Sequence, residues 1–513
     1  MEISHSRKIS QLDELAAGTK RLFIRLEELK NGLQPIQQLP ADMIVEIATF
    51  LNPRACGGDC QSIMAMSQVC HYWREILVSN PESWCFVSSE YLDLVPLFLE
   101  RLGSHPLEVT LTDTWFSHAV RHLEPHANQL AVLRCSVEEA NPVFLRALSR
   151  LDHSQNLHTF SITTTRAPPV GPRLVHMGLV SGDMPHLRTL ELLPFPVIPQ
   201  FVQFTHLINL RLDVMYSTLT DVLDLLAANH SLERVRLLGN FEDSEDTRAD
   251  GSISLGHLQF FTVERCTPCL FLEKLTLPRN ARIFIRYNLI SNLIPFAFSL
   301  PPSMGKYANL KGLTSLHVLM SFRSDSYYIE ATGPNGSVAI GFMDLQDTSP
   351  VCNAIASLPA TGITKFVCEF HPALTVMQVD KVIRMMGILP HLEEISLAHF
   401  GGADTQDFLS SLKNTSEWTK LLRLRFVHCR QMADWIGDLI QVAAERDERL
   451  TLDTITVVYE RRERTQELFG VLEGFVGTLE LVEVGTEEVL RSEQVWDDTS
   501  CTARIVSVPA WCD

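Results

Sequence analysis

The sequence predicts an α/β protein in which a small N-terminal group of helices precedes a long array of parallel strands backed by helices. Two patterns indicate this fold class. Apolar residues recur at steps of three and four in residues 8–77, and a short L-x-x-L-x-L pattern recurs from residue 130 onward. The chain has 513 residues, of which 46% are apolar and 20% charged, so it has enough apolar material for a packed interior.

The charge balance excludes some classes of function. The chain carries 43 basic and 61 acidic residues, a net charge of −18, whereas a general nucleic-acid binder needs a basic face. The N-terminus lacks the apolar core of a secretory signal, and the charge-free stretch 287–305 contains three prolines. We therefore expect an intracellular protein, in the cytoplasm or the nucleus, that binds neither nucleic acid nor membrane.

Catalytic and metal-binding motifs are missing from the sequence. Patterns of the types G-x-S-x-G, H-E-x-x-H and G-x-x-x-x-G-K-[ST] do not occur. Cys266 and Cys269 form a lone C-x-x-C without the second pair that a zinc site needs. We expect no catalytic residue, no cofactor and no metal, although an enzyme whose site assembles from residues distant in sequence stays open as an alternative.

Residues 1–36 are predicted to form an N-terminal amphipathic helix, which Gly32 and Pro35 end. Apolar residues spaced alternately by three and four residues form a coiled-coil seam with one polar member. The seam favours weak self-association through residues 12–33, and a single helix packed on the next domain is the alternative. Its members are Leu12, Leu15, Thr19, Leu22, Leu26, Leu29 and Leu33.

Residues 37–88 are predicted to form three short helices, closed by Asn80-Pro81 and Trp84. Leu39, Pro40 and the pair Met43-Ile44 crowd the start of the first helix on more than one of its faces. A unit of about 50 residues can bury only part of such a set. The apolar surface that is left over predicts a partner.

Three segments of this unit together resemble an F-box: LPADMIVEIATFL (39–51), SQVCHYWREIL (67–77) and the tryptophan of NPESW (80–84). Asp42 replaces the more usual glutamate, and the 52–61 loop is long and glycine-rich. The resemblance implies docking on the Skp adaptor through Leu39, Pro40, Met43, Ile44, Ile47 and Leu51. It implies a small helical core built from Val69, Trp73, Ile76 and Trp84.

Residues 89–513 are predicted to form an irregular solenoid that resembles leucine-rich repeats. Most steps between successive patterns are near 25–30 residues, and helical patterns at 220–228, 378–389, 434–444 and 465–475 lie between them. An ordinary α/β domain is the alternative, since the pattern also arises by chance. The patterns begin at Leu130, Leu157, Leu187, Leu207, Leu232, Leu272, Leu313, Ile363, Leu392, Leu421, Leu452 and Leu479.

Two insertions are expected in the solenoid. One, near 240–251, is an acidic loop. The other, near 325–350, contains two strand patterns joined by Thr332–Ser337 and is predicted to form a β-hairpin. A long insertion on a scaffold is either a binding element or decoration that the fold tolerates.

The resemblance implies a non-catalytic substrate-recognition subunit of a Skp-cullin-F-box ubiquitin ligase, with a cullin bound through the adaptor and a protein target on the solenoid. The alternative is a scaffold that mediates protein contacts without promoting degradation. The sequence does not assign the target-binding residues. Five arginines alternate with apolar residues, so they are expected on the exposed strand face, either for a phosphate or as ordinary solvated charges: Arg188, Arg211, Arg236, Arg423 and Arg425.

Overall fold

The protein is known from a computed structural model. It describes residues 2–51, 60–112, 116–138, 142–151, 154–165, 184–194, 204–214, 217–239, 252–264, 272–288, 307, 309–321, 326–343, 349–370, 379–414, 421–427, 429, 432–445, 454–460, 476 and 478–484. The 240–251 insertion, the Cys266 to Cys269 motif and the helix expected at 465–475 lie outside these residues.

The chain divides into two compact units, one reaching Glu191 and the other beginning at Leu192. Helices and mostly parallel strands alternate in both, which confirms the α/β class. The domain boundaries expected near residues 36 and 88 both fall inside the first unit and stay predictions. Among the described helices, none has the length and apolar character that a membrane span requires.

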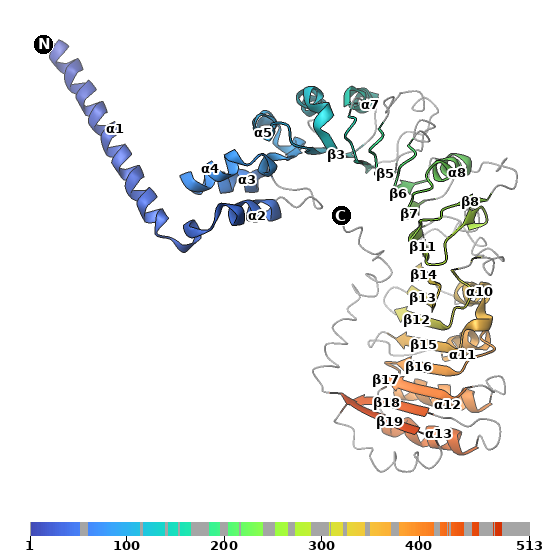
Figure 1. Ribbon diagram of the computed structural model, residues 1–513. Coiled ribbons are helices and arrows are strands. Elements are labelled where there is room, and N and C mark those ends of the chain that lie inside the picture. The colour runs from blue at the N-terminus through green and yellow to red at the C-terminus, as the bar shows by residue number, and fades with distance from the viewer. Residues whose placement is uncertain are drawn as a thin grey trace. The chain divides into compact units, whose positions relative to one another are not determined.

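The first unit begins with the helices expected from the apolar spacing. The long helix α1 is followed by a short 3-10 helix η1, three helices and a second 3-10 turn η2 (Figure 1). Helix α2 contacts α3 and α4, so the three form one small bundle. The bounds are α1 Glu2–Gly32, η1 Pro35–Gln38, α2 Ala41–Leu51, α3 Cys60–Ser67, α4 His71–Ser79 and η2 Pro81–Trp84.

Trp84 joins this bundle to the sheet-bearing part of the first unit. Its side chain is completely buried, and its Nε1 donates a hydrogen bond to the carbonyl of Leu77 at 2.7 Å. Its ring lies edge-on to Phe98, with centroids 4.9 Å apart, and the guanidinium of Arg101 lies 4.2 Å from its centroid. A tryptophan with every face in contact fixes the end of α4 against α5.

Four strands of the first unit are parallel in sequence order, β1 to β2, β2 to β3 and β3 to β4. Short helices connect them, as a parallel sheet requires. The elements are β1 Phe86–Ser88, η3 Ser89–Leu94, α5 Val95–Leu102, β2 Leu107–Thr112, α6 Phe116–Leu123, η5 Glu124–Gln129, β3 Leu130–Val137, α7 Pro142–Leu148, η6 Ser149–Leu151 and β4 Thr159–Thr164. The division between the two units falls within the next strand, β5 Thr189–Leu193.

The second unit carries the larger number of strands, with helices α8 and α10 to α13 beside them (Figure 1). Strands pair in the order β6, β7, β9, β11, β14, β13, β12, β15, β16, β17, β18, β19, and only the pairs of β13 are antiparallel. The elements are β6 Asn209–Asp213, α8 Leu219–Ala228, β7 Arg234–Leu238, β8 Ile253–Ser254, β9 Phe260–Glu264, β10 Leu275–Thr276, β11 Arg282–Asn288, β12 Ser315–Ser321, β13 Ser326–Gly333, β14 Gly336–Met343, α10 Ser349–Ser357, η10 Ala360–Gly362, β15 Lys365–Phe370, α11 Val379–Gly387, β16 Glu394–Ala398, α12 Gly402–Asn414, β17 Arg423–Val427, α13 Met432–Glu445, β18 Thr454–Glu460 and β19 Thr478–Val484.

One hydrogen-bond pattern recurs where the parallel strands begin. Two successive amides donate to one carbonyl at the equivalent place of the preceding strand: Glu393 and Glu394 donate to Thr364, and Leu422 and Arg423 donate to Glu393. The apolar pattern positions point into the helix side and are buried, while the residues between them face the other side. This alternation leaves one polar face, which is called the strand face below.

The strand predicted at Leu272 forms, but it does not join the main sheet. Its strand, β10, pairs with the short strand β8 in a separate two-stranded sheet. The main sheet instead uses β9, which follows Leu258 in the segment LQFFTV. That segment has apolar residues at all three marked positions, so the pattern was present and was missed. The wide step after Leu232 therefore contains a regular strand.

The hairpin expected near 325–350 is present, but it is not a projecting insertion. Strands β13 and β14 are antiparallel to each other and lie within the sheet between β11 and β12. Gly333 and Gly336 face each other at its turn. A Cβ on Gly333 would meet the backbone oxygen of Gly312 and would lie 2.9 Å from Cα of Leu313, so only glycine fits.

Candidate functional site

The first candidate surface lies on α2 and is called the α2 surface. Ile44 and Ala48 are completely buried on the side of α2 that faces the bundle. At about 100° per residue, Met43 and Phe50 lie on the adjoining stripe of the helix, and Leu51, seven residues after Ile44, lies on the stripe of Ile44 at the C-terminal end. Their side chains are 46%, 76% and 44% exposed. The apolar arc of α2 is therefore wider than the part that the described bundle covers.

The residues predicted to meet the adaptor differ in exposure. Just before α2, Pro40 is exposed and Leu39 is half-buried. Ile47 is half-buried in the middle of the helix. The Tyr72 hydroxyl, on α4, donates a hydrogen bond to the carbonyl of Leu39 at 3.2 Å and so fixes the start of α2. Ile44 requires a correction. Because it is completely buried in the bundle, it offers no surface to a partner.

The predicted core residues also need one correction. Trp73 is 5% exposed and Ile76 is half-buried, but Val69 is 51% exposed. Val69 lies in the turn after α3, not on the buried side of a helix, so its assignment to the core is wrong. The neighbouring Cys70 has a local role instead. Its Sγ accepts the amide of Trp73 at 3.4 Å and caps α4.

Phe50 was missed by the sequence reasoning. It is the most exposed large apolar residue of α2. The signal was available, because Phe50 lies seven residues after Met43 and therefore on the same stripe of the helix. It extends the α2 surface to the C-terminal end of the helix.

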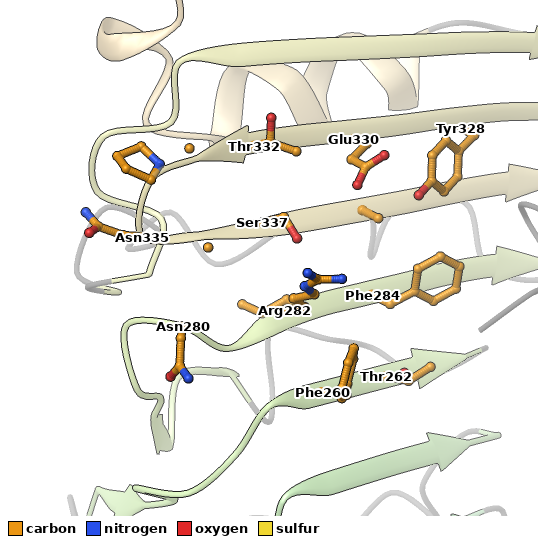
Figure 2. Close-up of a pocket in the computed structure, with 15 residues that line it drawn as sticks. Phe260, Thr262, Asn280, Arg282, Phe284, Tyr328, Glu330, Thr332, Asn335 and Ser337 are labelled. Atoms are coloured by element: carbon orange, nitrogen blue, oxygen red, sulfur yellow. The ribbon is translucent and has the colours of Figure 1, made fainter. Parts of the chain in front are cut away.

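The second candidate surface is a hollow of about 550 Å³ on the strand face of the second unit. Four strands form it: β9, β11, β14 and β13 (Figure 2). The turn of the hairpin closes one end. Its principal side chains are Phe260, Thr262, Asn280, Arg282, Phe284, Tyr328, Glu330, Thr332, Asn335 and Ser337.

Aromatic rings and guanidinium groups lie side by side on this face. Phe260 faces Arg234 on one neighbouring strand and Arg282 on the other. The two guanidinium carbons lie 5.6 and 5.8 Å from its ring centroid. The rings of Phe284 and Tyr328 come within 6.4 Å of each other, centroid to centroid, over strand β14, which presents only small side chains there.

A charged cluster borders the hollow. Arg236 Nη2 lies 2.7 Å from a carboxylate oxygen of Glu264, and Arg286 Nη1 lies 3.7 Å from the other. Burial lowers the pKa of Arg236; Glu264 opposes this shift, and Arg211 adds to it. An arginine keeps its proton at neutral pH even so, because its ordinary pKa lies far higher. Three arginines thus share this small area with one carboxylate.

The remaining predicted arginines lie elsewhere. Arg188 is exposed and directly precedes β5. Arg423 and Arg425 are exposed on β17, and Arg423 lies 3.9 Å from Glu394, which also holds Lys365 at 2.6 Å. The structure therefore brings together only Arg211 and Arg236 of the predicted set. It adds Arg234, Arg282 and Arg286, which the search for strand-end arginines missed.

Features that would indicate chemistry are not found in the described part of the chain. It contains no group of three histidine, cysteine or acidic side chains placed to hold a metal ion. Cys135 and Cys368 are buried, and burial raises the pKa of both thiols far above its usual range. A thiol held neutral is a poor nucleophile.

No protein-family model matches this chain. No curated protein matches it either. The two surfaces themselves therefore carry the functional argument. One is an apolar helix stripe, and the other is a strand face rich in arginine and aromatic residues.

Proposed function

We propose that this chain is the substrate-recognition subunit of a Skp-cullin-F-box ubiquitin ligase. The observation that carries the proposal is the apolar surface of α2 formed by the exposed Met43, Phe50 and Leu51 beside the buried Ile44 and Ala48. A contiguous apolar surface on a short helix is typical of a helix that docks into a groove. Its resemblance to an F-box names the groove as that of a Skp adaptor, and through the adaptor a cullin.

The size of the stripe supports a docking role. Covering a large apolar side chain stabilises a complex by about 1.5–3 kcal/mol. Three such residues, with Pro40 and part of Leu39 at the N-terminal end, provide apolar contacts along the whole length of α2. Bundle packing holds α2 in place before binding, since Ile44 and the Tyr72 to Leu39 hydrogen bond fix its orientation.

The second unit would present the target protein on its strand face. The chain itself would make and break no bonds. Its contribution would be to raise the effective concentration of a target lysine near the ubiquitin-conjugating enzyme and to orient it. Such a receptor works inside the cell, so we place it in the cytoplasm, the nucleus or both.

Met43→Asp and Phe50→Asp test the docking surface, because both residues are exposed and neither change disturbs the bundle core. Ile44→Asp is unsuitable, since a buried acidic residue would unfold the bundle. Val143→Asp on α7 is the matched control, an exposed apolar residue of the same unit far along the chain. Co-purification of a Skp adaptor from cells should be lost with the first two variants and kept with the control.

Adaptor capture that is equal for all three variants would contradict the proposal. The alternative, an F-box scaffold that does not promote degradation, predicts the same pattern of adaptor binding. It differs in the other partners. A cullin and ubiquitylated proteins accompany a ligase receptor and are missing from a scaffold.

We also propose that α1 mediates self-association between two copies of the chain. The leucines of its seam, from Leu12 to Leu33, are between 61% and 80% exposed, so the rest of the first unit does not cover them. Phe23 and Ile24 are exposed as well. A helix of 31 residues with an uncovered leucine seam is stabilised by a second helix along it.

A further inference from the structure

We infer that the strand face around the hollow binds an extended acidic segment of a partner protein through its arginines. The inference deepens the proposed function, because that partner would be the ligase target. Four features of the described residues support it: an excess of positive charge, two arginines without ion pairs, an aromatic wall, and a sheet whose backbone groups are already paired.

The local charge is opposite to that of the whole chain. Strands β7, β9, β11, β13 and β14 contain four arginines and two glutamates and no other charged residue. The face is therefore positive by two charges, on a chain with a net charge of −18. A positive patch on an acidic protein attracts an acidic partner and repels most of the protein's own surface.

Arg234 and Arg282 are placed to receive that partner. Neither forms an ion pair with any residue that the structure describes, and both stack beside the ring of Phe260. They lie two strands apart, a spacing of roughly 10 Å. Two acidic side chains three residues apart on a peptide in the extended polyproline II conformation lie on one face, about 9 Å apart, and can span it. The stacked ring holds the guanidinium groups in place, so less conformational entropy is lost on binding.

The aromatic wall adds an apolar contact next to the charges. Phe284 and Tyr328 are both half-buried and lie over the small residues of β14 (Figure 2). Aromatic residues and arginine dominate the energetics of protein interfaces. An acidic segment that also carries an apolar side chain would place that side chain in the hollow.

Two further features define the ligand. The hollow lies on the face of the sheet, where the strands are hydrogen-bonded to neighbours on both sides, so the partner is held by side chains and not as an added strand. Glu264 and Glu330 lie within the same surface. They would repel a doubly charged phosphate more than a carboxylate, so we assign carboxylates as the anionic groups.

A random dodecapeptide library displayed on phage tests the inference on the purified full chain. Peptides enriched on the wild-type protein should be rich in aspartate and glutamate. Arg282→Glu should weaken their binding about tenfold or more, and Glu330→Gln should strengthen it. Arg425→Glu is the matched control, an exposed arginine on the same face of a distant strand, and should leave binding unchanged. Circular dichroism checks that each variant is folded.

Enrichment of neutral or basic peptides would overturn the inference, and so would acidic peptides that bind Arg282→Glu as tightly as the wild type. An equal loss with Arg425→Glu would also overturn the inference, because it would show that the peptides respond to the overall charge of the protein and not to this site. The library contains no adaptor. If acidic peptides bind as expected while adaptor capture fails, the proposed ligase function is wrong and the acidic-segment site stands.

Discussion

Arg236 and Glu264 form an ion pair at 2.7 Å between Nη2 and a carboxylate oxygen, and their side chains are only 14% and 6% exposed. Arg286 reaches the same carboxylate. Farther along the strand face, Glu394 stands between Lys365 and Arg423 in a similar arrangement, but those cations are much more exposed. A glutamate between two cations thus occurs twice on the strand face, once largely buried and once exposed to water.

Glu264→Gln should lower the free energy of unfolding by about 2–4 kcal/mol, because it leaves buried arginines without their counter-charge. Glu394→Gln should lower it by less than about 1 kcal/mol, because water screens that pair. The shift of the urea unfolding midpoint measures both. Equal losses would contradict the account of a buried charge cluster.

A buried asparagine should be equally sensitive. Asn229 is completely buried; its Oδ1 accepts the amide of Leu207 at 3.0 Å and its Nδ2 donates to the carbonyl of Leu225 at 2.8 Å. Asn229→Ala leaves both backbone groups without these partners and should cost about 2–3 kcal/mol. Asn156→Ala, which removes one exposed hydrogen bond to Asn128, should cost far less in the same urea experiment. A larger loss with Asn156→Ala than with Asn229→Ala would show that Asn229 does not hold the backbone at Leu207 to the backbone at Leu225.

The sequence predicted the kinds of elements better than their places. The L-x-x-L-x-L spacing identifies three side chains that need burial, but it does not say which sheet buries them. Leu272 and Leu258 both satisfy it, and only the strand after Leu258 joins the main sheet. Long-range pairing decides such cases, and it leaves no trace in a six-residue window.

The α2 surface shows the same limit. The spacing of Met43, Ile44 and Ile47 predicts an apolar arc, and the arc is present. Which part of the arc is buried depends on where α3 and α4 pack against it. The sequence alone therefore does not show that Ile44 is buried and Met43 exposed. Val69 was misplaced because the helix before it ends at Ser67, and turn residues do not follow helical periodicity.

The buried thiols allow a test of packing by reactivity. Because burial raises the pKa of Cys135 and Cys368, both stay protonated at pH 8, and alkylation needs the thiolate. Iodoacetamide should therefore leave both unmodified in the folded chain and label them after unfolding in urea, as read by mass spectrometry. Labelling of native Cys135 as fast as that of the partly exposed Cys352 would contradict its burial.

The α1 seam makes a prediction about mass in solution. Leu22→Asp places a charge in the middle of the exposed leucines and should shift sedimentation equilibrium toward the monomer. Ala17→Asp adds the same charge to the same helix outside the seam and should leave the mass unchanged. A wild-type chain that sediments as a monomer at all concentrations would rule out self-association through α1.

Docking of the α2 surface on a Skp adaptor is the central claim, and hydrogen exchange of the purified full chain tests it most directly. Adding purified adaptor should slow amide exchange in residues 39–51. Phe50→Asp should bind the adaptor about tenfold or more weakly than the wild type, and Val143→Asp should bind it as tightly as the wild type. Unchanged exchange in residues 39–51 at saturating adaptor would contradict the claim.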